Sequence, residues 1–114
     1  MSACVIGRVA RLKPEGAAEY ARLHAEEWGT VRGLYHDAGF RRFRILHHPS
    51  TGLLVSVVEH GGPDPNSAFQ ALWRLPAIDT WRRRCAAHQE AVQPAAGAGI
   101  WAPADLILSD DLDS

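Results

Sequence analysis

The spacing of apolar residues changes twice before residue 60, and these changes restrict the chain to a mixed α and β fold. Residues 3–12 are rich in small apolar and β-branched side chains and end at a Lys-Pro-Glu-Gly sequence, which is typical of a strand followed by a turn. From residue 17 to about residue 36, apolar and aromatic side chains recur every three or four positions. This spacing predicts an amphipathic helix, which Gly39 would end with a left-handed cap.

The next segment predicts a β-hairpin. Residues 40–47 alternate between apolar and basic side chains, as a half-buried strand does. The sequence His-Pro-Ser-Thr-Gly at residues 48–52 is typical of a turn, and residues 53–60 form an apolar run long enough for another strand. That strand is apolar on both of its faces, so both faces of the sheet need a cover.

The second half of the chain repeats the helix-then-strand order. Pro76 disfavours the helical conformation of the residue before it and therefore divides the helical region in two. The predicted elements are, in order, a loop over 61–66, helices over 67–74 and 77–92, a loop over 93–99 and a strand over 100–108. The resulting order β-α-β-β-α-β is the split, ferredoxin-like arrangement of the α+β class.

The length predicts a single domain over residues 1–109, followed by a frayed acidic tail over 110–114. Helices on one face of a four-stranded sheet would leave the other face uncovered. We therefore expect a homodimer in which two sheets pack together around a barrel-like interior, a dimeric α+β barrel. The alternative is a monomer with a semi-polar outer face, which Ser56 and His60 would permit.

The amino-acid composition limits the kinds of molecule that we expect the protein to bind. The 12 basic and 13 acidic residues give a net charge of −1, which predicts no binding to nucleic acid or to an anionic membrane. No apolar run approaches the roughly 20 residues of a membrane-spanning helix, and no signal peptide is evident. Cys4 and Cys85 are too few for a disulfide scaffold, although one bond between them stays open. We expect a cytoplasmic protein whose partners are a small molecule and a second copy of itself.

Tyr20, His24 and Trp28 are four residues apart, so they share one face of the first predicted helix. Together they offer a phenol, an imidazole that titrates near neutral pH and an indole that can stack on a ligand. The same pattern also fits a packed core that contains one histidine.

The other candidate sites carry weaker signals. His47 and His48 are adjacent and would point apart on a strand, so a solvated turn is favoured over a metal site. Arg42 and Arg44 share one side of their strand and could bind an anionic or polyhydroxyl ligand, although a solvated basic face is the usual interpretation.

Over nearly its whole length the sequence resembles the L-rhamnose mutarotases. These are small dimeric ferredoxin-like proteins that interconvert the α and β anomers of a sugar without a metal or cofactor. The resemblance is carried by Leu12-Lys13-Pro14-Glu15, Glu19-Tyr20, His24, Trp28, Gly39, Leu53-Leu54, Val58-Glu59 and Trp81.

The resemblance implies roles for these residues. His24 would give and accept the proton, Tyr20 would contact the sugar, and Trp81 would wall the pocket with Trp28 beside it. Two pairs depart from the family pattern: Arg42-Phe43 replaces an Asn-Tyr pair, and Trp81-Arg82 replaces a Trp-Trp pair. These changes remove hydroxyl and amide groups of the kind that hydrogen-bond to sugar hydroxyls, and they add positively charged groups.

Three functions therefore stay open. The first is mutarotation of a deoxyhexose such as L-rhamnose or L-fucose by acid and base catalysis through His24. The second is an isomerase or cyclase of specialised metabolism in which Arg42 and Arg44 bind an enolate or carboxylate. The third is a binding module without turnover.

Overall fold

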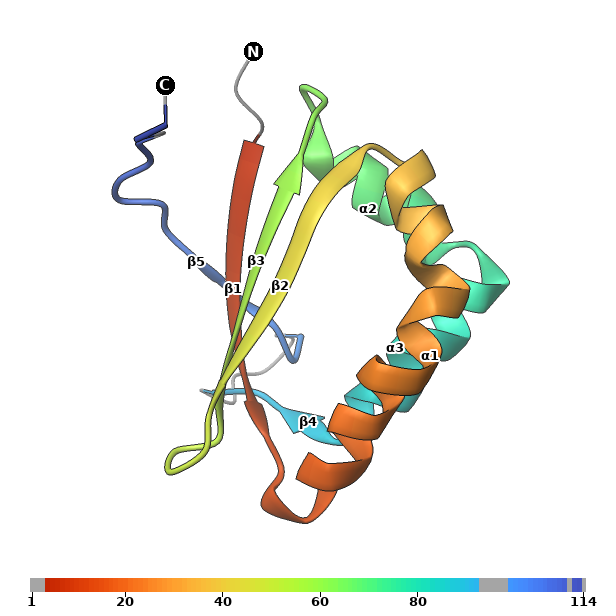
Figure 1. Ribbon diagram of the computed structural model, residues 1–114, viewed down its shortest axis with the longest axis vertical. Helices are drawn as coiled ribbons and strands as arrows, with labels where there is room; N and C mark the ends of the chain where they lie inside the picture. Colours follow the sequence, from red (N-terminus) through yellow and green to blue (C-terminus); the bar gives the residue numbers. More distant parts are fainter. Residues whose placement is uncertain (1–3, 93–98, 111, 114) are drawn as a thin grey trace.

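The fold is built on one antiparallel sheet with helices on one of its faces (Figure 1). The computed structural model describes residues 4–92, 99–110 and 112–113. Its elements are β1 (Cys4–Leu12), the 3₁₀ turn η1 (Pro14–Gly16), α1 (Ala17–Asp37), β2 (Phe40–His48), β3 (Leu53–His60), α2 (Pro65–Trp73), α3 (Pro76–Ala86), β4 (Gln89–Glu90) and β5 (Ala102–Ala104).

The strand order confirms the ferredoxin-like prediction. The sheet runs β2-β3-β1-β4, and β5 also pairs with β1. Because β3 lies antiparallel between β1 and β2, the connection through α1 is the split β-α-β unit. In Figure 1 the helices α1 and α3 lie side by side on the same side of the sheet. None of the described helices is both long and apolar enough to cross a membrane.

The first helix and the hairpin form as the sequence predicts. α1 continues through Gly29 and Gly33, both of which are exposed, and ends just before Gly39. Gly39 adopts φ +95°, a conformation that favours glycine. A Cβ at this position would lie 2.9 Å from Nε2 of His60. That nitrogen lies 2.8 Å from the carbonyl oxygen of Ala38, so the glycine leaves room for a side chain that ties β3 to the end of α1.

The C-terminal half departs from the prediction in two places. The helix predicted over 77–92 ends at Ala86, because Gln89 and Glu90 pair with Leu12 and Arg11 at the open edge of β1. The strand predicted over 100–108 shortens to β5, whose residues pair with the middle of β1. After β5 the apolar residues have no strand partner, and Ile107 and Leu108 are 91% and 79% exposed. The final strand is thus split between β4 and β5.

Two other predictions fall wholly or partly outside the described residues. The loop predicted over 93–99 is described only at Gly99, and the acidic tail over 110–114 lacks residues 111 and 114.

The two cysteines are unpaired: Cys4 is half-buried and Cys85 is buried.

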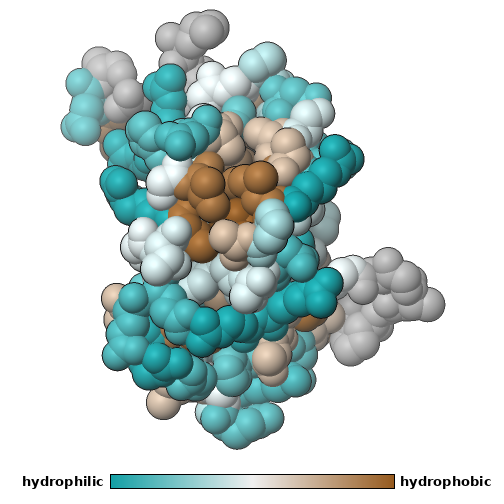
Figure 2. Space-filling model, turned by 90° about the vertical axis from the view of Figure 1, so that its right-hand side faces the viewer, coloured by the Kyte–Doolittle hydropathy of each residue, from teal (hydrophilic) through white to brown (hydrophobic). Residues whose placement is uncertain are grey.

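The strand register assigns each side chain to one face of the sheet. Leu54, Ser56, Val58 and His60 are buried and face the helices, and the intervening residues of β3 are half-buried on the outer face. The outward surface of the helices is mainly hydrophilic, with one small apolar patch (Figure 2). β3 carries apolar side chains on its outer face as well as on its inner face. The outer face of the sheet is therefore more apolar than a face that contacts only water.

Candidate active site

A cavity of about 800 Å³ lies between the helices and the inner face of the sheet. Tyr20, His24 and Trp28 all line it from α1, and Trp81 lines it from α3. The structure therefore brings these four predicted residues together at one cavity. Phe43, Ile45 and Ser56 form part of the opposite wall, on the sheet.

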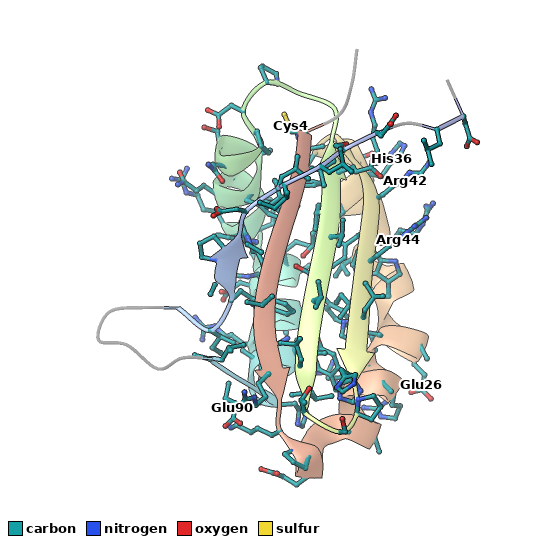
Figure 3. All side chains as sticks on the ribbon, turned by 90° about the vertical axis from the view of Figure 1, so that its left-hand side faces the viewer. Cys4, Glu26, His36, Arg42, Arg44 and Glu90 are labelled. Atoms are coloured by element: carbon teal, nitrogen blue, oxygen red, sulfur yellow. The ribbon has the colours of Figure 1, made fainter. Side chains whose placement is uncertain are left out.

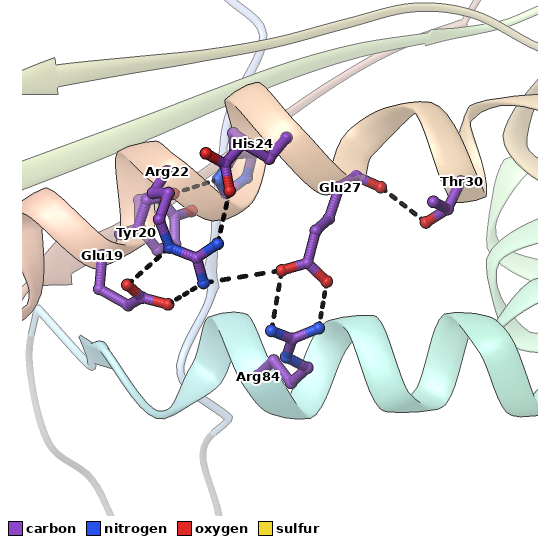
Figure 4. Close-up of polar contacts among 8 residues, drawn as sticks. Glu19, Tyr20, Arg22, His24, Glu27, Thr30 and Arg84 are labelled. Atoms are coloured by element: carbon purple, nitrogen blue, oxygen red, sulfur yellow. Dashed lines mark hydrogen bonds and ion pairs between the residues drawn. The ribbon is translucent and has the colours of Figure 1, made fainter.

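His24 has one ring nitrogen fixed by the helix that carries it. Its Nδ1 lies 2.9 Å from the backbone carbonyl oxygen of Tyr20, one turn earlier (Figure 4). A carbonyl oxygen only accepts hydrogen bonds, so Nδ1 carries a hydrogen and, in the neutral ring, Nε2 keeps its lone pair. The ring is half-buried and lies between Tyr20 and Trp81, at centroid distances of 4.4 and 5.0 Å. Nε2 is the nitrogen left to exchange a proton with a ligand.

Tyr20 belongs to a chain of three side chains from distant parts of the sequence. Trp101 donates its indole N–H to Oε1 of Gln89 at 3.2 Å, and Nε2 of Gln89 donates to the Tyr20 hydroxyl at 2.9 Å. Because the indole nitrogen can only donate, it fixes which end of the Gln89 amide faces Tyr20. Gln89 thus occupies the Tyr20 oxygen as an acceptor and leaves the phenolic hydrogen to be donated elsewhere.

Burial controls the protonation of the two tyrosines at the cavity. Tyr20 is 6% exposed, and this burial raises its pKa well above the ordinary range, against the hydrogen bond from Gln89, which lowers it. Burial also raises the pKa of Tyr35 to about 12. Both phenols therefore stay neutral under all ordinary conditions and can serve as hydrogen-bond donors rather than as proton sources.

Aromatic rings form the wall next to His24. Trp28 lies 6.1 Å from Trp81, 5.4 Å from Phe43 and 5.1 Å from Tyr35, measured between ring centroids. Tilted rings at these distances pack favourably and hold one another in place. Such a wall offers flat apolar faces against which the C–H face of a sugar ring can stack.

An ion-pair network outside the cavity joins the two helices that carry the site. The guanidinium of Arg84 on α3 pairs through two hydrogen bonds with the carboxylate of Glu27 on α1, and Arg22 pairs with Glu19 and Glu26 (Figure 4). A two-point pair of this kind fixes geometry as well as distance. It contributes to the relative placement of His24 and Trp81.

Arg42 and Arg44 do share one side of β2, as predicted, but it is the side away from the cavity. Phe43 and Ile45 take the inward positions, so strand alternation turns the two arginines to the outer face (Figure 3). Arg42 forms an ion pair with Glu59 at 3.0 Å. The structure does not bring these two residues together with His24.

Several residues that sequence reasoning did not select also line the cavity. They include Arg8 on β1, Trp73 on α2, Arg82 on α3, Gln89 on β4, and Trp101. His47 lines it as well, whereas the side chain of His48 hydrogen-bonds to Thr51 in the turn at 2.9 Å. In the described part of the chain, no group of three or more His, Cys, Asp or Glu residues is arranged to hold a metal ion.

Comparison with known proteins identifies the fold and the family. The L-rhamnose mutarotase of Formosa agariphila superposes with a TM-score of 0.71 at 14% identity, over 95% of this chain and 99% of that one. The tetracenomycin F2 cyclase of Streptomyces glaucescens, a type-II polyketide cyclase, gives a TM-score of 0.65 at 18% identity, over 95% and 99% of the two chains. At these identities the two structures show a common fold only.

The sequence comparisons are more specific. An L-rhamnose mutarotase of Paraburkholderia phytofirmans is 28% identical over 72 residues, which are 63% of this chain and 62% of that protein. The aligned part thus spans less than two thirds of that relative. The sequence model of the L-rhamnose mutarotases matches residues 5–107, nearly the whole of this chain. The chain therefore belongs to the L-rhamnose mutarotase family.

Proposed function

We propose that this protein is a sugar mutarotase that interconverts α and β anomers through His24. The observation that carries the proposal is the fixed imidazole: Nδ1 is engaged by the Tyr20 carbonyl, and Nε2 is left for a ligand in an aromatic cavity. Membership of the L-rhamnose mutarotase family supports the same reaction.

Mutarotation needs one proton removed and one returned. In ring opening, the anomeric hydroxyl loses its proton to Nε2 of His24 while the bond between C1 and the ring oxygen breaks and C1 becomes a carbonyl carbon. The ring oxygen then takes the proton from the imidazolium and becomes a hydroxyl. After rotation about C1–C2, the same two transfers in reverse close the ring on the opposite face of the carbonyl.

One imidazole is enough for both transfers. The anomeric oxygen and the ring oxygen are bonded to the same carbon, so a single nitrogen can reach each of them with little movement. Burial raises the pKa of Tyr20, so its phenol is a poor proton source and serves instead to orient the sugar by donating a hydrogen bond. Trp81 and Trp28 supply the stacking faces.

The proposal is tested by saturation-transfer NMR of the anomeric protons of L-rhamnose, L-fucose and related sugars. The protein should accelerate anomer exchange for at least one sugar, and His24→Ala should remove the acceleration. His36→Ala changes an exposed histidine at the end of α1 and is the matched control. Absence of acceleration with every sugar would refute the proposal.

The outer face of the sheet does not favour the second function. The isomerase or cyclase hypothesis used Arg42 and Arg44 as the anion site, and these residues lie on the face opposite the cavity. That hypothesis therefore loses the two residues to which it assigned the anion.

We also propose that the protein is a homodimer formed by the outer sheet faces. Val55 and Val57 are half-buried on that face, and Leu46 is 57% exposed there. Covering these side chains would stabilise a two-fold pair. Sedimentation equilibrium should give a dimer, and Val57→Arg should give a monomer. Ala25→Arg on the exposed side of α1 should leave the dimer intact, and a monomeric wild type would contradict the proposal.

The cysteines favour a reducing compartment. Cys4 and Cys85 are unpaired, and burial raises the pKa of Cys85 to about 12, which keeps that thiol unreactive. We therefore propose a cytoplasmic location, which fractionation of cells expressing the protein would test.

A further inference from the structure

Two arginines converge on one tryptophan at the α2 side of the cavity. The guanidinium carbon of Arg8 lies 5.4 Å from the centroid of the Trp73 ring and 4.5 Å from that of Phe69. The guanidinium carbon of Arg82 lies 4.0 Å from the centroid of Trp73. All four residues line the same cavity as His24. This end of the cavity is therefore cationic as well as aromatic.

Neither guanidinium has an acidic partner among the described residues. Asp79 also lines the cavity, but its carboxylate pairs with Arg83 at 3.0 Å. Glu27 is engaged by Arg84, and Glu59 by Arg42. Among the residues that the structure describes, no carboxylate oxygen lies within 4.0 Å of a nitrogen of Arg8 or Arg82. Within the described part of the chain, the two positive charges thus line the cavity without a carboxylate partner.

Burying the charge of Arg8 next to Arg82 costs free energy, and packing alone does not explain that cost. β1 turns Arg8 to its inner face, where it is half-buried, whereas Val9 takes the outer face. Burial lowers the pKa of Arg8, and the neighbouring charge of Arg82 lowers it further. A half-buried cation beside a like charge is stabilised when an anion joins them, and guanidinium groups are suited to two-point binding of carboxylate or phosphate.

We propose that Arg8 and Arg82 form a binding site for the anionic group of the substrate, so that the sugar on which this protein acts is an acidic one. The inference rests on the proposed mutarotase function. The substrate carries a carboxylate or a phosphate ester, its charged group lies between the two arginines, and its anomeric carbon lies at His24. Trp73 and Phe69 hold the guanidinium groups from the side away from the ligand.

A purely structural role for the two arginines predicts something different. If they only clamp Trp73, replacing them lowers stability and leaves the choice among sugars unchanged. If they bind the ligand, replacing them changes that choice. The measurement must therefore compare substrates that differ only in charge.

Matched sugars provide the first arm. Glucose, glucuronate and glucose 6-phosphate differ only at C6, and galactose, galacturonate and galactose 6-phosphate form a second such series. Saturation-transfer NMR should give faster anomer exchange for the carboxylate or for the phosphate than for the neutral sugar of the same series, and it separates the two sources of charge. L-Rhamnose and L-fucose are included as neutral deoxyhexoses. Arg8→Met and Arg82→Gln should each lower exchange of the favoured acidic sugar about tenfold or more.

Direct anion binding provides the second arm and needs no turnover. Inorganic phosphate and acetate are titrated at constant ionic strength while tryptophan fluorescence is followed, because both guanidinium groups lie close to the Trp73 ring. We expect saturable binding of at least one anion that both variants weaken. Arg82 is exposed, so Arg82→Gln should fold even if Arg8→Met does not. Arg32→Gln, on the exposed side of α1, is the control that should behave as wild type.

The arms separate the two proposals. Exchange of neutral sugars without anion binding, and with sugar choice unchanged in both variants, would overturn the acidic-substrate inference and leave the mutarotase proposal standing. Anion binding that both variants weaken, with no exchange of any sugar, would support the anion site and refute the mutarotase. Absence of both would overturn both.

Discussion

Replacing Gln89 by leucine should destabilise the protein by roughly 2–4 kcal/mol, because it breaks the chain that holds Tyr20 at the cavity. Gln89 is 6% exposed and makes two side-chain hydrogen bonds, to Tyr20 at 2.9 Å and from Trp101 at 3.2 Å. Each buried polar group left without a partner costs about 1–3 kcal/mol. Trp101 is only half-buried, so its N–H can regain water and contributes at the lower end of that range.

A double-mutant cycle tests the coupling between the two residues. Tyr20→Phe alone leaves the Gln89 amide without its acceptor and should cost about 1–2 kcal/mol. In the double variant both members of the pair are gone, so its cost should fall short of the sum by about 1 kcal/mol or more. Urea denaturation at one protein concentration gives all three values, and the fixed concentration keeps any self-association constant. Costs that add to within about 0.3 kcal/mol would show that the two side chains act independently and would refute the reasoning.

Three further predictions follow from burial and backbone geometry. Because burial raises the pKa of Tyr35 to about 12 from 10.0, the unfolded chain loses this proton first, so Tyr35 should contribute roughly 2–3 kcal/mol to the fall in unfolding free energy between about pH 10 and 12. Urea denaturation across that range should show a smaller fall in Tyr35→Phe, and an equal fall would contradict the assignment. Gly39→Ala should cost about 1–3 kcal/mol, since φ is +95° and a Cβ would meet His60, whereas Gly33→Ala, in open space on α1, should raise stability by about 0.5–1 kcal/mol. Cys85 should resist alkylation at pH 8 in the folded protein and react once urea unfolds it, because burial raises its pKa to about 12, and modification of the native thiol would overturn this expectation.

The parts of the fold that the sequence predicts well are those with a strong local period. α1 and β2 each bury one face, so their apolar spacing records the local structure directly, and β3 is marked by an apolar run that follows a turn sequence. The helical period predicts that Gln89 and Glu90 lie in a helix over 77–92. They form β4 because the open edge of β1 offers hydrogen bonds there, and that edge is a property of the assembled sheet.

The residues of the candidate site divide in the same way, into those that share one helix and those that meet only in the folded chain. Tyr20, His24 and Trp28 lie on one helix, so their spacing alone places them on a common face. Gln89 and Trp101 join Tyr20 from about 70 and 80 residues away, and no local pattern could relate them. The two sides of a strand are separated by alternation, but alternation alone does not say which side faces inward. Arg42 and Arg44 therefore lie on the outer face instead of at the cavity, whereas Arg8 on β1 faces inward.

One histidine would be sufficient for the proposed reaction, because the same imidazole can take up a proton and give it back. The open-chain sugar closes to either anomer by the same pair of proton transfers, so the catalyst must be able to act as base and acid in both directions. If one residue served only as the acid and another only as the base, each ring opening would leave the acid without its proton and the base with an extra one. His24 gives back the proton that it takes and ends every half-reaction as it began. Tyr20 cannot replace it, because burial raises the pKa of that phenol and its oxygen already accepts a hydrogen bond from Gln89. Burial makes Tyr20 a poor acid, the hydrogen bond from Gln89 leaves its O–H free to donate to a ligand, and the proton transfers are left to Nε2 of His24.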